Sequence, residues 1–188
     1  MQNLMLYVPN TITILRLLAV PVTVWLVLEG RMAPAFWLFV AAGVSDAVDG
    51  LIARSFRART RLGAYLDPVA DKALLVGVFL ALGYTDLLPG WLVGLVVLRD
   101  AVIIFGVWYL TMHLKERLAM QPLWVSKFNT VAQIALAILV LAVEGKGLES
   151  LDTYVPVAVG LVAVTTTYSL AAYVLRGLLI LRTRETAG

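Results

Sequence analysis

Six long apolar runs constrain the fold of this chain more than any other feature of its sequence. They lie at about residues 11–28, 34–53, 66–85, 89–112, 127–143 and 154–181. A helix needs roughly 20 mostly apolar residues to cross the hydrocarbon core of a bilayer. The sequence therefore predicts an all-α integral membrane protein with about six transmembrane helices, built as a single domain over residues 1–188.

Composition supports a membrane protein and excludes some classes of site. Hydrophobic residues make up 61% of the chain and charged residues 14%, whereas soluble domains are about half apolar and about a quarter charged. The chain has no cysteine, which excludes disulfides and a thiol nucleophile. The net charge of +3 gives no indication of a nucleic-acid partner, and we expect none.

The segments between the runs carry turn signals. Glu29-Gly30-Arg31, Leu88-Pro89-Gly90 and Glu144-Gly145-Lys146 are predicted turns because they combine glycine or proline with charged or chain-breaking neighbours. The opening stretch MQNLMLYVPN is too weakly apolar to span a bilayer. We expect it to form a short helix lying at the membrane interface.

Positive charge is distributed unevenly between the connections. The second-to-third connection, the fourth-to-fifth connection and the C-terminal tail carry Arg54, Arg57, Arg59, Arg61, Lys115, Arg117, Lys127, Arg182 and Arg184. The other connections carry Arg31 and Lys146 beside Glu29, Asp86, Glu144, Glu149 and Asp152. Because basic residues favour the cytoplasmic side, the sequence predicts that both termini and the arginine-rich connection are cytoplasmic.

Four aspartates flank the arginine-rich connection. Asp46 and Asp49 lie three residues apart near the end of the second run, and Asp67 and Asp71 lie four apart near the start of the third. Both spacings place a pair on one face of a helix. Because the connection is short, we expect antiparallel neighbouring helices whose aspartates converge at about headgroup depth.

Carboxylates gathered in this way repel each other unless a cation neutralises them. His113 is the only histidine and lies far along the chain, so the donors are oxygens alone, which favours a hard divalent ion such as Mg²⁺, Mn²⁺ or Ca²⁺. Such an ion commonly shares phosphate oxygens with its ligands. The motif thus predicts a site for a pyrophosphate-containing donor.

Small residues and one arginine accompany the acids. Gly50, Ala53 and Gly63 allow a ligand to come close, and Arg54 offers a donor suited to phosphate. The alternative is that the acids pair with neighbouring arginines at a solvated helix end, which leaves the small residues at fixed offsets unexplained.

The stretch DAVDGLIAR at 46–54, followed by Gly63, Asp67 and Asp71, resembles the complete signature of the CDP-alcohol phosphotransferases. Members of that family transfer a phosphatidyl or similar group from a CDP-linked donor to an alcohol and release CMP. The resemblance implies a membrane enzyme that uses CDP-diacylglycerol, contacts membrane lipids and forms a homodimer. With the charge pattern, which places the aspartates at the cytoplasmic side, we expect a multi-pass protein of the bacterial inner membrane with its active site facing the cytoplasm.

The resemblance also assigns roles. Asp46, Asp49, Asp67 and Asp71 would ligate one or two divalent ions, Mg²⁺ or Mn²⁺, and Asp71 would act as general base. The residues implied for the cytidine nucleotide are Gly50, Ala53, Arg54 and Gly63, with Asn10 and Thr13 of PNTITILR as further candidates. The alternative is that Asn10 is a helix cap and that Thr13 is an ordinary helical threonine.

The acceptor is indicated by GAYLDPVADK, LRDAVII and SKFNTVAQ, which resemble the branch containing phosphatidylglycerophosphate synthases and CMP-forming cardiolipin synthases. Arg99, Lys127, Lys72 and Asn129 are the candidate acceptor-binding residues. For Arg99 and Lys127 the alternative is a long side chain that reaches from the bilayer to its interface.

One departure within this branch favours a particular acceptor. Glycerophosphate-using synthases usually carry a Lys-x-Lys-Thr pattern, whereas this chain has Lys127-Phe128-Asn129-Thr130. A phosphomonoester brings more negative charge than a phosphodiester and favours more cationic donors. We therefore expect phosphatidylglycerol as acceptor, with glycerol 3-phosphate as the alternative.

A divalent-cation transporter is a remote alternative from another class, because acidic residues in membrane helices also serve ion pathways. A transporter usually places its site near the midplane between repeated halves. The aspartates here gather near one membrane face, and the sequence shows no internal repeat.

Overall fold

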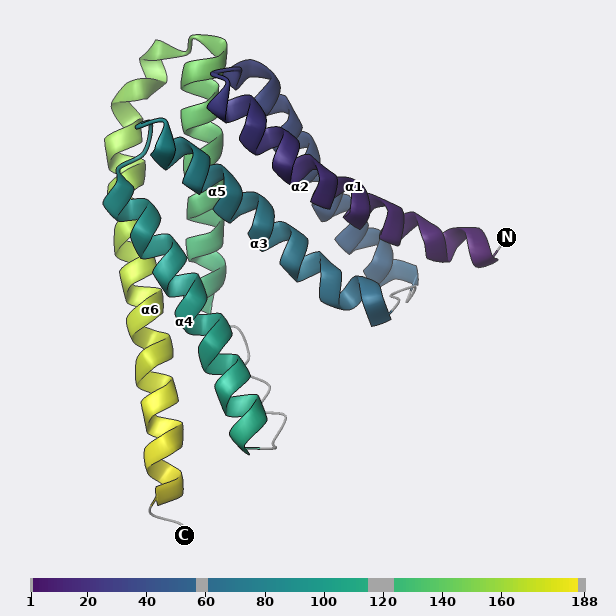
Figure 1. Ribbon diagram of the computed structural model, residues 1–188, viewed down its shortest axis with the longest axis vertical. Helices are drawn as coiled ribbons and strands as arrows, with labels where there is room; N and C mark the ends of the chain where they lie inside the picture. Colours follow the sequence, from purple (N-terminus) through teal and green to yellow (C-terminus); the bar gives the residue numbers. More distant parts are fainter. Residues whose placement is uncertain (1, 57–60, 115–123, 186–188) are drawn as a thin grey trace. The chain divides into compact units, whose positions relative to one another are not determined.

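The computed structural model describes residues 2–56, 61–114 and 124–185, and within these ranges every regular element is a helix (Figure 1). Side chains are described at residues 15–45, 72–106, 108, 124–179 and 182. The elements are α1 (Gln2–Leu28), α2 (Met32–Phe56), α3 (Arg61–Tyr84), α4 (Gly90–Leu114), α5 (Trp124–Lys146), the 3₁₀ helix η1 (Glu149–Tyr154) and α6 (Val155–Glu185). The all-helical fold is confirmed for the described part.

Two helices in the described ranges are long and apolar enough to cross a membrane, Trp124–Lys146 and Glu149–Leu179. Shorter apolar helical segments lie at Leu15–Leu28, Met32–Ser45 and Lys72–Tyr84. The number of transmembrane helices, the side on which the termini lie and the single membrane domain over 1–188 stay predictions.

The first ten residues do not form a helix of their own. The structure has one continuous helix, α1, from Gln2 to Leu28. Leu4, Met5 and Leu6 are good helix formers, and the stretch contains no glycine to end the helix. The expected separate interfacial helix is therefore wrong in this respect.

The chain divides into two compact units, each described by itself. The first comprises Met1–Leu88 and Ala137–Thr153. Within it α1 packs against both α2 and α3, around fully buried side chains that include Val27, Phe79 and Leu82. Gly77 lets α3 approach α1 closely, since a Cβ there would lie 3.1 Å from Cγ2 of Val24. Helix α1 thus holds the two helices that carry the four aspartates.

The last turn of α5 packs closely against the start of α2 in the same unit. A Cβ on Gly145 would lie 2.7 Å from the backbone nitrogen of Ala33, so a glycine is needed there. Helix α5 continues to Lys146, and Gly147 follows it with a φ of 63°, a conformation that glycine adopts readily at helix ends. The turn predicted at 144–146 therefore begins later, at Gly147.

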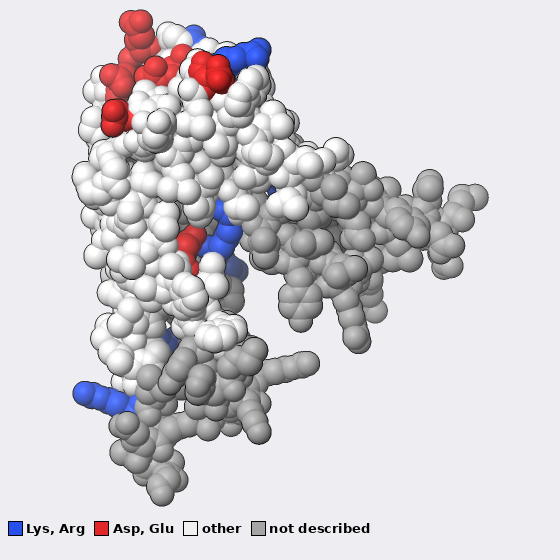
Figure 2. Space-filling model, in the orientation of Figure 1, with Lys and Arg blue, Asp and Glu red and all other residues white. Residues whose placement is uncertain are grey.

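Acidic side chains gather at one end of the first unit (Figure 2). The acidic residues of its described side chains are Glu29, Asp86, Glu144, Glu149 and Asp152, and all are exposed. They belong to the connections that the charge pattern assigned to a single side of the membrane. The side of the membrane on which they lie stays a prediction.

The second unit comprises Pro89–Leu136 and Tyr154–Gly188, and in it α4 packs against α6. Its interior combines apolar side chains with polar ones. The buried polar side chains of this unit are Arg99, Asp100, Asn129, Gln133, Thr166 and Ser169. They come from α4, the first half of α5 and the middle of α6.

Candidate functional site

The four aspartates lie on two helices that pack on α1. Asp46 and Asp49 are one turn apart near the end of α2, and Asp67 and Asp71 are one turn apart near the start of α3. Their side chains lie outside the described residues, and so do the side chains or surroundings of Gly50, Ala53, Arg54, Gly63, Asn10 and Thr13. The convergence of the aspartates and the nucleotide contacts stay predictions.

The donor set fits a hard divalent ion by its chemistry, because all four groups are carboxylates. Among the side chains that the structure describes, no three His, Cys, Asp or Glu residues lie close enough to hold a metal ion. The described part of the chain therefore offers no site that competes with the aspartates.

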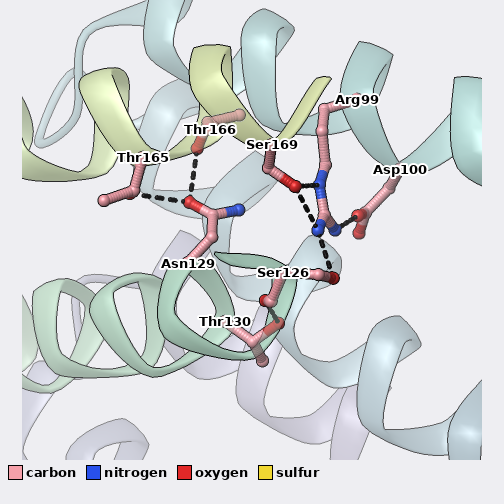
Figure 3. Close-up of polar contacts among 8 residues, drawn as sticks. All are labelled: Arg99, Asp100, Ser126, Asn129, Thr130, Thr165, Thr166 and Ser169. Atoms are coloured by element: carbon pink, nitrogen blue, oxygen red, sulfur yellow. Dashed lines mark hydrogen bonds and ion pairs between the residues drawn. The ribbon is translucent and has the colours of Figure 1, made fainter. Parts of the chain in front are cut away.

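Arg99 is the centre of a buried polar network in the second unit (Figure 3). Its Nη1 donates to Oδ1 of Asp100 at 2.6 Å, and its Nη2 donates to Oγ of Ser126 at 2.5 Å. Nε and Nη2 donate to Oγ of Ser169 at 3.1 and 2.9 Å. The guanidinium carbon also lies 6.0 Å from the ring centre of Tyr173. One side chain of α4 thereby contacts both α5 and α6.

Asn129 forms a second set of contacts between α5 and α6 (Figure 3). Its Oδ1 accepts hydrogen bonds from the hydroxyls of Thr165 at 2.9 Å and Thr166 at 2.8 Å. The amide nitrogen of Asn129 and that of Gln133, one turn further along α5, are buried without a hydrogen-bond partner among the described residues. These two amide nitrogens are therefore buried hydrogen-bond donors that the network itself does not use.

The expected acceptor-binding residues differ in their surroundings. Arg99 and Asn129 are buried, whereas Lys127 is exposed and its Nζ lies 5.1 Å from the ring centre of Trp124. Lys72 lies on α3 in the first unit and is half-buried. In the second unit, the hydrogen bond from Arg99 to Ser126 links α4 to the first turn of α5, which also carries Lys127.

Sequence reasoning missed the partners of Arg99 and Asn129. Ser126, Thr165, Thr166 and Ser169 were not recognised as members of a site. A signal was present, because Ser126, Asn129 and Gln133 recur at helical spacing from just before one apolar run into it, and Thr165, Thr166 and Ser169 do so within another run. Polar residues inside membrane helices usually face other helices rather than lipid.

Comparison with known proteins addresses the family directly. Residues 6–178 match the family model described as CDP-alcohol phosphatidyltransferase. The chain is similar to rice CDP-diacylglycerol–glycerol-3-phosphate 3-phosphatidyltransferase 1, chloroplastic, with 35% identity over 89% of the chain and 56% of the relative. It is also similar to a probable cardiolipin synthase (CMP-forming) of Drosophila melanogaster, with 34% identity over 71% of the chain and 46% of the relative.

A third relative is a probable phosphatidylglycerophosphate synthase of Mycobacterium tuberculosis, with 32% identity over 72% of the chain and 66% of the relative. The chain spans about half the length of the first two of these relatives. Their names divide between two acceptors, but the match to the family model includes both helices that carry the aspartates and every residue of the polar network. The chain belongs to the CDP-alcohol phosphatidyltransferase family.

Proposed function

We propose that this chain is an integral membrane enzyme that transfers the phosphatidyl group of CDP-diacylglycerol to a glycerol-type acceptor and releases CMP. The observation that carries the proposal is the family match over residues 6–178, which includes the complete aspartate signature on α2 and α3. The reaction would take place at the cytoplasmic face of a bacterial inner membrane, as the charge pattern and the family resemblance suggest.

The four aspartates would hold one or two divalent ions, Mg²⁺ or Mn²⁺. A bound ion supplies Lewis-acid neutralisation of the donor's pyrophosphate. Asp71 would accept the proton of the acceptor's hydroxyl while that oxygen bonds to the phosphorus on the lipid side of the donor. The bond from this phosphorus to the CMP oxygen breaks, and CMP leaves. Gly50, Ala53, Arg54 and Gly63 would hold the nucleotide, with Asn10 and Thr13 as further contacts.

Phosphatidylglycerol is the acceptor that we favour, which makes the proposed enzyme a CMP-forming cardiolipin synthase. The charge of Arg99 is balanced by Asp100, and Asn129 is uncharged. Of these candidates in the second unit, Lys127 thus brings the net positive charge. A modest positive charge suits a phosphodiester with a single negative charge better than a phosphomonoester.

Glycerol 3-phosphate is the second candidate acceptor, which would make the enzyme a phosphatidylglycerophosphate synthase. The rice relative is named for that acceptor, and the Mycobacterium tuberculosis relative is named as such a synthase. Both candidate reactions use the same donor and the same aspartates, so they differ only in how the acceptor is recognised.

The experiment uses the purified chain in detergent with CDP-diacylglycerol and Mg²⁺ or Mn²⁺. Phosphatidylglycerol and glycerol 3-phosphate are offered separately, and CMP and the lipid product are followed. Cardiolipin from the first supports the favoured proposal, and phosphatidylglycerophosphate from the second supports the alternative. If neither acceptor gave metal-dependent release of CMP, both proposed reactions would be wrong.

A homodimer is the assembly that the family resemblance suggests, and we include it in the proposal. Crosslinking in native membranes, followed by denaturing electrophoresis, checks this point. A monomer at every crosslinker concentration would count against it.

A further inference from the structure

Arg99 is buried, and its donors are engaged by neighbouring side chains. Only 1% of the residue is exposed. A guanidinium has five N–H groups, and the contacts with Asp100, Ser126 and Ser169 use four of them. The carboxylate of Asp100 balances its charge at 2.6 Å. Arg99 therefore differs from the exposed arginine that would be expected to receive an acceptor's phosphate.

The contacts of Arg99 join three helices of the second unit (Figure 3). The guanidinium leaves α4 and donates to the first turn of α5 at Ser126 and to α6 at Ser169. Its planar fork fixes the directions of these hydrogen bonds. Because the group is buried and charged, breaking its contacts costs more than breaking those of a surface pair. The start of α5 is thus held in one position relative to α4 and α6.

Lys127 follows Ser126 directly on the turn that Arg99 holds. Unlike Arg99, it is exposed, and its ammonium lies 5.1 Å from the ring centre of Trp124. A helical turn moves as a unit, so a hydrogen bond at Ser126 also restricts the backbone of Lys127.

We propose that Arg99 is a positioning residue, which acts on the acceptor through Lys127 by fixing the first turn of α5. The inference rests on the proposed function, in which Lys127 binds the acceptor. In a direct role, the guanidinium would have to give up Ser126 and Ser169, and a phosphate would have to reach a side chain that is 1% exposed. The positioning role needs neither change.

The test is a double-mutant cycle with Ser126→Ala and Lys127→Ala, measured as steady-state kinetics with the active acceptor. Ser126→Ala removes the link to α5 but leaves Arg99, Asp100 and Ser169 in place. We expect it to raise the acceptor's KM about fivefold, with kcat and the KM for CDP-diacylglycerol unchanged. In the Lys127→Ala background, Ser126→Ala should have no further effect, because interacting residues are not additive.

Thr130→Val is the matched control. Thr130 lies one turn after Ser126 on α5, but its hydroxyl donates to the backbone oxygen of Ser126 at 3.0 Å and does not contact Arg99. It should leave the acceptor's KM unchanged. A fivefold effect of Ser126→Ala that persists in the Lys127→Ala background would overturn the proposal. The proposal would also be overturned if Ser126→Ala lowered the melting temperature but left the acceptor's KM unchanged, because a purely structural contact would give that result.

A second measurement does not depend on turnover. Because the chain has no cysteine, Lys127→Cys provides a single attachment point for a nitroxide spin label. We expect Ser126→Ala and Arg99→Gln to increase the label's mobility, and Thr130→Val to leave it unchanged. Equal mobility in all variants would overturn the positioning role even if the protein proved inactive, whereas the CMP assay of the unaltered chain separately judges the proposed function.

Discussion

Two fully buried threonines, Thr23 in the first unit and Thr166 in the second, use their hydroxyls differently. Thr23 donates to the backbone oxygen of Ala19 in its own helix at 2.7 Å. Thr166 donates to the side chain of Asn129 on another helix at 2.8 Å. Among the described residues of the first unit, Gly77 and Gly145 let helices approach each other closely, which is a contact by shape. The second unit joins its helices by hydrogen bonds, which depend on the chemistry of particular side chains.

This difference suggests a division of roles under the proposed function. The first unit carries the aspartates expected to perform the transfer. The second carries Lys127 and Asn129, expected to recognise the acceptor, and Arg99, expected to position Lys127. Changes in the two units should then affect different quantities. The aspartates should govern turnover, the packing glycines should govern stability, and the polar network should govern acceptor affinity and helix association.

The largest effect is expected from Asp71→Asn in the first unit. Loss of the general base should lower kcat by a factor of about 10³, while the binding of CDP-diacylglycerol stays largely intact. The measurements are CMP release and equilibrium binding of the donor. Asp86→Asn is the control, because Asp86 is exposed and its φ of 59° is tolerated by asparagine. Loss of donor binding in a folded Asp71→Asn protein would count against its role as base.

The aspartates and the polar network also differ in how far the sequence could predict them. The aspartate motif is local, since its spacing on two helices can be read along the chain. The contact between Arg99 and Ser169 joins residues 70 positions apart, and it depends on how α4 and α6 are rotated about their axes. Packing sets that rotation, so the polar residues could be noticed in the sequence but not paired.

Helix ends show a similar limit. The six apolar runs predicted the positions of the six α-helices, but Gly145 was assigned to a turn because it lies between Glu144 and Lys146. The structure places it inside α5, where it allows contact with the backbone of α2. A glycine needed for a turn and a glycine needed for close packing look the same in one sequence.

Gly145→Ala should have the next largest effect and acts on stability. Its Cβ would lie 2.7 Å from backbone atoms of Met32 and Ala33, which cannot move as a side chain can. We expect a loss of about 2 kcal/mol in the free energy of unfolding, measured in detergent by denaturant titration. Gly43→Ala on α2 is the matched control, because a Cβ there meets nothing within 4 Å. It should be neutral or stabilising by up to about 1 kcal/mol. Equal effects of the two variants would remove the role assigned to close packing.

In the second unit, two nearly isosteric substitutions should have opposite signs. Thr166→Val removes a satisfied donor to Asn129 and should destabilise by about 1 kcal/mol. Gln133→Met removes a buried amide nitrogen that has no partner among the described residues, and it should stabilise by about 1 kcal/mol because that desolvation penalty disappears. Thermal unfolding of both variants checks the signs. A lower melting temperature for Gln133→Met would show that the amide has a partner in solution, such as an ordered water.

The smallest effect is expected where the first unit does use a charged side chain to join helices. The ammonium of Lys146 on α5 lies 4.0 Å from the ring centre of Trp37 and 4.7 Å from that of Phe36, both on α2. Lys146→Met keeps most of the apolar stem and removes the charge, so it should cost only about 0.5 kcal/mol at this exposed position. A double-mutant cycle with Trp37→Leu isolates the contact, because the loss should shrink when the ring is absent. If Lys146→Met instead destabilised as much as Thr166→Val, specific polar contacts would join the helices of the first unit as strongly as those of the second. The contrast between the two units would then fail.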